Sequence, residues 1–353
     1  MKMTMRWFGD KFDTVKLWQI RQVPGVVGVI STLYDALPGE DWDAGAVAAL
    51  KAQVEEAGLQ LLGIESVNVH DAIKAGHPNR DRYIENYVST LRKLGELDIH
   101  MVCYNFMPVF DWVRSDLAHV RPDGSFTFYY DQAEIDKVDP ELMSGHMNAG
   151  SKGFPLPGWE PERMARIRDL FETYRGLDEG ALLDNLCYFL RAVMPVCDRY
   201  DINMAIHIDD PAWSVFGLPR IVTDGERIRK ILRAVDNPHN GVTLCTGSLS
   251  TNPQNDIPAV IRSLKGRIHF AHVRNTRHHA PGVFEEAAHY AADGSLDMVE
   301  IMRALLDVGF DGPIRPDHGR AIWGEVSLPG YGLYDRALGT QYLLGILDAL
   351  THR

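Results

Sequence analysis

Short apolar runs recur along the whole chain, separated by longer segments in which apolar residues follow a helical period. Most of these runs are apolar at consecutive positions instead of alternating with polar residues, which is typical of parallel strands covered by helices. We therefore predict buried parallel strands at residues 3–9, 25–30, 59–67, 99–106, 202–208, 241–247, 267–273 and 312–317.

Segments with the pattern of amphipathic helices lie between these runs. In the segment 43–59, Val47, Leu50, Val54 and Ala57 fall on one stripe, and Gly58 follows them as a helix C-cap. The same reasoning predicts helices at residues 12–23, 43–59, 82–97, 182–200, 224–235, 256–266, 295–310 and 333–350.

The alternation of eight strands with eight helices predicts an α/β fold, a (β/α)₈ TIM barrel formed as a single domain over residues 1–353. A doubly wound open sheet is the alternative, but no Gly-x-Gly-x-x-Gly motif follows the first predicted strand. A typical barrel needs about 250 residues, and the surplus lies mostly in residues 107–180. This stretch is rich in Pro, Gly, Asp and aromatic residues, and we interpret it as a cap-like insertion after strand 4, folded over the active-site end.

The composition is that of an ordinary globular protein, with 45% hydrophobic and 24% charged residues. The net charge of −12 argues against nucleic acid and against an anionic membrane surface, because both require a basic face. A small anionic substrate needs only local positive groups. No apolar stretch approaches the roughly 20 residues that cross a bilayer, and the first residues lack the apolar core of a signal peptide. We therefore expect a cytoplasmic protein with neither a nucleic-acid nor a membrane partner.

The cysteines indicate free thiols or metal ligands. Four cysteines are too few to make a disulfide framework in a chain of 353 residues, and no Cys-x-x-Cys pair occurs. They are Cys103, Cys187, Cys197 and Cys245.

Candidate metal ligands stand at the ends of four consecutive predicted strands. In a TIM barrel the active site lies at the C-terminal ends of the strands, and there the sequence places His207, Cys245, His272 and Asp317. A single histidine near a strand end is more often a hydrogen-bonded residue, and a lone cysteine is usually a small buried apolar one. The joint pattern is hard to explain by packing, because neighbouring strands lie about 4.8 Å apart and their ends can converge. Two imidazoles, a thiolate and a carboxylate suit a divalent transition metal.

Other polar residues at the same strand ends are candidates for acid–base chemistry and substrate binding. His318 directly follows Asp317 and is a candidate general acid or base, because its ordinary pKa lies near neutrality; the alternative is that it only orients Asp317. Arg274 and Arg320 are fixed positive donors suited to a carboxylate. The remaining candidates for substrate binding at this rim are Asp209 and Asn275.

The positions of the neighbouring histidines and tyrosines predict which of them can join the site. His269 and His272 are three residues apart, so they face opposite sides of one strand, and the later one is the better ligand. His278 and His279 are expected on a loop, facing solvent or substrate. Two tyrosines follow the last strand: Tyr331 lies in a glycine-flanked loop that can fold back over the rim, whereas Tyr334 is expected to pack in the final helix.

Several motifs resemble those of the mannonate dehydratase family of hexuronate catabolism. They are MRWFG, AIHIDDP, TLCTGS, HFAHVRN, RPDHGR and PGYGLYDRALG, and the resemblance runs over nearly the whole chain. It implies a xylose-isomerase-like barrel that binds one Mn²⁺ or Fe²⁺ and removes water from D-mannonate to give 2-keto-3-deoxy-D-gluconate. The family's metal ligands fall on His207, Cys245, His272 and Asp317, and its catalytic pair on His318 and Tyr331. The donor atoms alone would also admit Zn²⁺.

Two other functions remain open from the residues. A metal-dependent sugar isomerase or epimerase on the same barrel would share the ligands but would not expel water. A non-catalytic sugar-acid sensor would bind the same anionic ligand without needing an acid–base group such as His318. A metallo-endonuclease is disfavoured by the acidic charge. Because the helices of a barrel often present apolar faces, a homo-oligomer, a dimer or higher, is expected.

Overall fold

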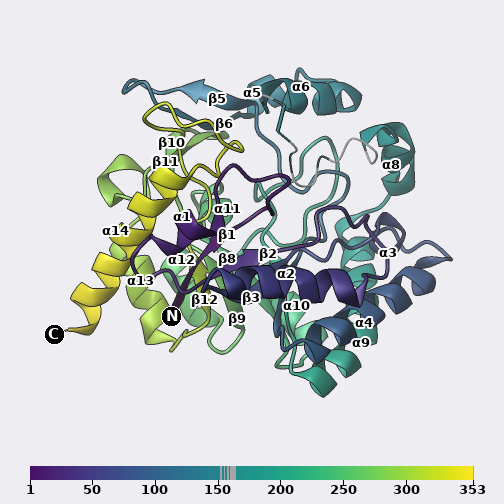
Figure 1. The fold of residues 1–353 in the computed structure, drawn as a ribbon. Coiled ribbons are helices and arrows are strands. Elements are labelled where there is room, and N and C mark those ends of the chain that lie inside the picture. The colour runs from purple at the N-terminus through teal and green to yellow at the C-terminus, as the bar shows by residue number, and fades with distance from the viewer. Residues whose placement is uncertain (152, 155, 157–158, 160–163, 353) are drawn as a thin grey trace.

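Eight parallel strands close into a barrel, as predicted (Figure 1). The computed structural model describes residues 1–151, 153–154, 156, 159 and 164–352. Around the barrel the strands follow chain order, interrupted only where extra elements are inserted after the fourth and seventh strands. The barrel strands are β1 (Lys2–Arg6), β2 (Gly28–Ser31), β3 (Gln60–Glu65), β4 (Met101–Tyr104), β7 (Asn203–His207), β8 (Asn240–Cys245), β9 (Ile268–His272) and β12 (Pro313–Arg315).

A helix overlaps each segment where the sequence pattern predicted one. Many of these helices begin directly after an aspartate whose carboxylate accepts an amide hydrogen bond from the first turn, as Asp43 does from Ala46 at 2.7 Å. The first helix is shorter than predicted. The helices are α1 (Leu17–Arg21), α2 (Ala44–Glu56), α4 (Arg80–Glu96), α9 (Glu179–Tyr200), α10 (Gly225–Ala234), α12 (Ile257–Ser263), α13 (Met298–Asp307) and α14 (Leu333–Thr351), with short helices α3 (Asp71–Lys74) and α11 (Thr246–Ser250).

Helix α9 changes one expectation from the sequence. Among the described helices it alone is long and apolar enough to cross a membrane by length and composition, a test that core helices of soluble proteins also pass. Its apolar side chains, such as Leu186 and Leu190, are buried in the main core. Phe189 meets Tyr87 of α4 edge to face, with the ring centroids 4.9 Å apart. In this fold α9 therefore packs as a core helix of the barrel.

A second sheet covers one end of the barrel and is built from two separate excursions of the chain. Its order is β10-β11-β6-β5, and it lies above the barrel with α5 and α6 beside it (Figure 1). The segment after β4 supplies β5 (Asp116–Val120), β6 (Phe126–Asp131), α5 (Gln132–Ile135), η1 (Pro140–Leu142), α6 (Met143–Gly150) and α8 (Ile167–Tyr174). The segment after β9 supplies β10 (Asn275–Ala280) and β11 (Val283–Ala287), followed by η2 (Ala291–Asp293).

The strands β10 and β11 were not predicted. We expected His278 and His279 on a loop, but both lie in β10, which pairs antiparallel with β11. The two strands belong to the covering sheet, where β10 pairs with β11 and β11 pairs with β6. In the predicted insertion, residues 152, 155, 157–158 and 160–163 lie outside the described residues.

The covering sheet has a core of its own. Trp112 stacks on Phe128 of β6 with the centroids 5.4 Å apart, and Tyr130 of β6 stacks on Phe284 of β11 at 5.1 Å. The second of these contacts joins the two excursions to each other, and the first lies within the segment after β4. They fix the sheet to residues that line the barrel mouth.

Inside the barrel, side chains alternate between the interior and the surrounding helices. An apolar interior layer contains Ile30, Met101, Cys103, Ala205 and Phe270. Because side chains two residues apart on a strand point to the same face, the next interior positions toward the C-terminal mouth follow two residues later. Those positions are polar and include Thr32, Asn105, His207 and His272.

Candidate active site

A cavity of about 480 Å³ opens at the C-terminal ends of the barrel strands. Its walls combine residues of the barrel strands, of the loops that follow them, and of the first excursion. Charged and aromatic side chains predominate around its inner part. They include Arg6, Glu65, Trp112, His207, Asp210, Arg274, Arg315, Asp317, His318 and Tyr331.

The four predicted metal ligands come together at this end of the barrel, and two of them, His207 and Asp317, line the cavity. One ligand atom each of His207, Cys245 and His272 lies within 4.8 Å of the other two. An Asp317 carboxylate oxygen, Oδ2, lies 3.8 Å from the sulfur of Cys245 and 3.8 Å from Nδ1 of His272. The register explains the convergence, since Cys245 and His272 are direct partners in the pairing of β8 with β9. Two imidazole nitrogens, a sulfur and a carboxylate fit a divalent transition metal, and all of these side chains are buried except that of His207, which is partly exposed.

The surroundings of Cys245 favour the thiolate form. Burial alone would raise the pKa of this thiol, but the positive charge of Arg274 and hydrogen bonds with His207 and His272 hold it well below its ordinary value. Ser248 supports the sulfur from the start of α11, with its hydroxyl at 3.1 Å and its amide at 3.4 Å. A thiolate is the form of cysteine that binds metal.

Asp317 is held in a strained backbone conformation. Its φ of 64° lies in the left-handed region that non-glycine residues rarely adopt. The carboxylate is fixed on two sides, by Arg315 Nη2 at 2.7 Å and by Arg274 Nε at 2.8 Å. The turn after β12 thereby directs this carboxylate toward Cys245 and His272, at the cost of local strain.

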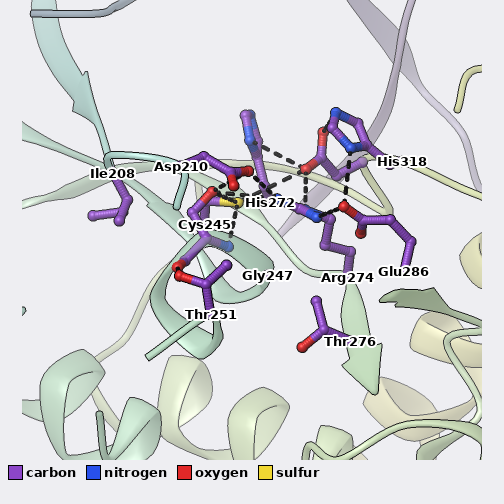
Figure 2. Close-up of polar contacts among 12 residues, drawn as sticks. Ile208, Asp210, Cys245, Gly247, Thr251, His272, Arg274, Thr276, Glu286 and His318 are labelled. Atoms are coloured by element: carbon purple, nitrogen blue, oxygen red, sulfur yellow. Dashed lines mark hydrogen bonds and ion pairs between the residues drawn. The ribbon is translucent and has the colours of Figure 1, made fainter. Parts of the chain in front are cut away.

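Arg274 lines the cavity, but its guanidinium is surrounded by carboxylates (Figure 2). It contacts Asp317, Asp210 at 2.7 Å, and Glu286 of β11. Arg114 of the first excursion pairs with the same two acids, at 2.7 Å from Asp210 and 2.8 Å from Glu286. Arg274, which we predicted as a substrate-binding donor, lines the cavity, but its donors face three protein carboxylates.

Asp209 is also placed differently from the prediction. Its carboxylate points away from the cavity and accepts the amides of Ile221 and Val222, both at 2.8 Å. The cavity wall is instead formed by the next residue, Asp210. The sequence offered both acids at the end of this strand, and only the path of the chain after β7 distinguishes them.

Asn275 and Arg320 likewise lie outside the cavity lining, which corrects both substrate-binding predictions. Asn275 is buried at the start of β10, where its amide donates to two backbone carbonyls of the segment after β11. Arg320 is paired with Asp335 of α14 at 2.9 Å and with Asp123 at 3.2 Å. Both side chains tie the loops of the rim together, so neither is available to a ligand.

His318 and Tyr331 lie side by side on the cavity wall. Their ring centroids are 5.1 Å apart, and His318 also meets Phe128 of the covering sheet at 5.3 Å. Nδ1 of His318 is 3.6 Å from the Glu286 carboxylate. Burial raises the pKa of Tyr331 to about 12, so this phenol keeps its proton at neutral pH. By contrast, Tyr334 is 44% exposed on α14.

Several charged residues of the site were missed by the sequence reasoning. Arg6, Glu65 and Arg315 all line the cavity, and each is a charged residue in an otherwise apolar predicted strand. Their position at the C-terminal end of the strand was a usable signal, since Glu65 stands two residues beyond Gly63 on the interior face. Arg114 and Glu286 gave no such signal, because they come from the excursions.

Comparisons with known proteins identify the family of this chain. The family model described as D-mannonate dehydratase (UxuA) matches residues 1–353. A mannonate dehydratase of Brachyspira hyodysenteriae is 61% identical over 350 residues, covering 99% of each chain. The crystal structure of mannonate dehydratase from Streptococcus suis serotype 2 superposes with a TM-score of 0.90 at 42% identity, covering 100% of this chain and 95% of the other. A xylose isomerase domain protein from Planctomyces limnophilus, with a TM-score of 0.56 and 10% identity over 99% of this chain and 98% of the other, shares the fold alone. The chain belongs to the D-mannonate dehydratase family.

Proposed function

We propose that this protein is a hydro-lyase that converts D-mannonate into 2-keto-3-deoxy-D-gluconate and water. The observation that carries the proposal is the convergence of His207, Cys245 and His272 within 4.8 Å, next to a cavity that His207, His318 and Tyr331 line. Family membership over the whole chain gives the reaction and the substrate. The substrate is a small anionic sugar acid, consistent with the arginines on the cavity wall.

The proposed metal is Mn²⁺ or Fe²⁺, one ion per chain, held by His207, Cys245, His272 and Asp317. When bound, it supplies a Lewis acid that polarises an oxygen of the substrate. The buried thiolate and imidazoles fit such an ion, and the choice of manganese or iron rests on the family resemblance.

The proposed acid–base pair is His318 and Tyr331. Dehydration removes the proton from C2 and the hydroxyl from C3, so one group must accept a proton and another must donate one. The enol that remains takes up a proton at C3 to give the keto acid. Both side chains line the cavity and their rings lie 5.1 Å apart, which places two proton-exchanging groups within reach of adjacent substrate carbons.

We further propose that residues 107–180 act as a cap within a single TIM-barrel domain spanning residues 1–353. Trp112, from the start of this region, lines the cavity, and Phe128 contacts His318. Their aromatic rings would exclude water from the reacting carbons.

We also propose a cytoplasmic location, a homo-oligomeric state, and no nucleic-acid or membrane partner. The four cysteines are free and buried, which suits a reducing compartment. The acidic net charge of −12 opposes polyanions. Trp323 and Val326 are 74% and 75% exposed in the loop before α14, and such apolar side chains favour contact with a second copy.

The test is an assay of the purified protein on D-mannonate with Mn²⁺ or Fe²⁺, with and without a chelator, together with elemental analysis. We expect a 2-keto-3-deoxy acid to form only with metal. An epimer or ketose formed without loss of water would instead indicate an isomerase or epimerase. Bound metal without turnover of any aldonate would indicate a sensor.

A further inference from the structure

The carboxylate of a sugar acid needs a positive partner in the cavity, and the arginines first considered for this role are committed elsewhere. Arg274 faces three carboxylates, and Arg320 lies outside the cavity lining. We propose that Arg6 of β1 and Arg315 of β12 form the subsite for the substrate carboxylate. This inference rests on the proposed function. It predicts which wall of the cavity binds the carboxylate end of the substrate.

Arg315 provides buried donors without a partner. It is 1% exposed and lines the cavity. One nitrogen, Nη2, contacts Glu65 at 3.0 Å and Asp317 at 2.7 Å. Its Nε and Nη1 are buried and make no hydrogen bond to any residue that the structure describes. Because a buried donor without a partner is costly, these atoms indicate a binding position for a ligand at this wall.

Arg6 stands beside Arg315 on the neighbouring strand and shares its acid. Nη1 of Arg6 lies 2.6 Å from Oε1 of Glu65, the same oxygen that Arg315 contacts. Its Nε donates to the hydroxyl of Tyr34 at 2.8 Å. Arginine has five N–H donors in a fixed fork, so the outer side of this guanidinium remains for an oxygen of a ligand.

The sharing of acids also distinguishes this wall of the cavity. On the other side of the cavity, Arg114 and Arg274 are matched by two acids that contact both of them. Arg6 and Arg315 share only Glu65. The second acid of Arg315, Asp317, also contacts Arg274 and belongs to the proposed metal ligands.

Glu65 is the acid that both guanidiniums contact, and Asp317 is shared between Arg315 and Arg274. The carboxylate of an aldonate has the paired oxygens to accept the remaining donors of Arg6 and Arg315, and arginine binds such a group in a bidentate manner.

This position also fits the chemistry. Phe8 lies between the arginine wall and the proposed acid–base pair: the guanidinium carbon of Arg6 is 5.0 Å from the centre of its ring, and the Tyr331 ring centroid is 4.6 Å away. A carboxylate held by Arg6 and Arg315 places C2, the adjacent carbon, toward Tyr331 and His318. The subsite therefore orients the substrate so that the proton to be removed faces the pair.

The test uses Arg6, since Arg315 also contacts a proposed metal ligand. Variants Arg6→Gln and Arg6→Lys are compared with wild type for steady-state kinetics on D-mannonate, and for inhibition by D-mannonamide, the neutral amide with the same hydroxyls. We expect KM for D-mannonate to rise about 10- to 100-fold in Arg6→Gln, as for loss of a hydrogen bond to a charged group. Arg6→Lys should show a smaller rise, because an ammonium keeps the charge but not the fork.

Inhibition by the amide distinguishes charge recognition from general damage. Its inhibition constant should stay within about 3-fold of wild type in both variants, since that ligand lacks the charge that Arg6 binds. An unchanged KM for D-mannonate, or an equal loss of affinity for acid and amide, would overturn the proposal. Arg303→Gln on α13, where the side chain is 40% exposed, is the matched control and should leave both constants unchanged.

Metal content and thermal unfolding are measured on every variant. If Arg6→Gln does not fold, the test uses Arg6→Lys, because this variant keeps a cation beside Glu65. A wild-type KM for D-mannonate in Arg6→Lys would show that the forked donors of arginine are not needed, and would refute the proposal. Failure of the proposed function gives a different result: wild type itself would then form no 2-keto-3-deoxy acid. In that event calorimetric titration of metal-loaded wild type and Arg6→Gln with D-mannonate tests the subsite, and equal affinities would refute it.

Discussion

Two buried cysteines in adjacent regions of the barrel interior have opposite chemistry. Cys103 belongs to the apolar layer with Met101 and Phe270, and burial raises the pKa of its thiol well above the ordinary value. Cys245 is equally buried at the mouth, yet the charge of Arg274 and the neighbouring imidazoles hold its pKa well below that value. Burial alone therefore does not decide whether a barrel cysteine is a packing residue or a ligand. The charged groups that surround the thiol inside the barrel decide this.

The two regions also differ in their source of stability. The lower layer is held by apolar contacts between strands of one sheet. The mouth is held by ion pairs that include residues of the excursions, such as Arg114 and Glu286. Buried ion pairs stabilise only when every partner is present. We therefore expect the stability of the mouth to fall when a single charged residue is replaced. The stability of the lower layer should depend mainly on the volume of its side chains.

The largest expected effect is that of Cys245→Ser. Replacing the thiolate by a hydroxyl removes the soft ligand, so metal affinity should fall by more than about 100-fold and activity should fall with it. Elemental analysis after dialysis and turnover of D-mannonate measure the two effects. Normal metal content in this variant would remove Cys245 from the proposed ligands.

His318→Asn should abolish most turnover while leaving the metal in place. Loss of a group that transfers protons costs about 10²- to 10⁴-fold in kcat. Metal content should match wild type, since His318 is not among the proposed ligands. A fall in metal content along with kcat would contradict the acid–base role and assign this residue to support of Asp317.

Glu286→Gln should have an intermediate effect. The change keeps the shape but leaves Arg114 and Arg274 with one fewer acid, and it removes the carboxylate that lies 3.6 Å from Nδ1 of His318. We expect a fall in kcat of about 10- to 100-fold and a lower melting temperature.

Glu285→Gln is the matched control on the same strand, because Glu285 is also buried but pairs with Arg121 at 3.0 Å. It should lower the melting temperature and leave kcat near wild type. Equal kcat values in the two variants would refute a positioning role for Glu286.

The smallest effect is expected for Cys103→Ala in the lower layer. Removing the sulfur should cost about 1 kcal/mol of unfolding free energy, with metal content and kcat unchanged. Chemical denaturation and the D-mannonate assay measure this. If Cys103→Ala impaired metal binding as Cys245→Ser does, the separation of the two regions would be wrong.

The barrel was predictable because its strands are local patterns. Runs such as residues 202–208 and 241–247 are apolar and lie between amphipathic segments, and each contains a barrel strand. The strands β10 and β11 were not predictable in this way, because β11 pairs with β6, a segment more than 140 residues earlier in the chain, and β10 joins the sheet only through β11. Hydrophobic periodicity is read over short segments, so it cannot reveal a pairing partner that lies so far away in the sequence.

The residues of the candidate site also differ in how far the sequence could predict them. His207, Cys245, His272 and Asp317 were found because each stands at the end of a predicted strand, and the closed barrel brings such ends together. The substrate-binding predictions at Asp209, Asn275 and Arg320 used the same reasoning and were wrong, because the direction of a side chain beyond the strand end depends on the loop.

The sequence by itself determined the barrel and the polar residues at the C-terminal ends of its strands, because hydrophobic periodicity and strand order can be read from residues close together in the chain. Only the tertiary structure decided which charges neutralise one another. Arg274 and Arg6 are both arginines at the ends of barrel strands, yet one faces three carboxylates and the other shares Glu65 with Arg315. Electrostatic partners are set by distance in space, and the residues that supply them here are separated by as many as 250 positions along the chain.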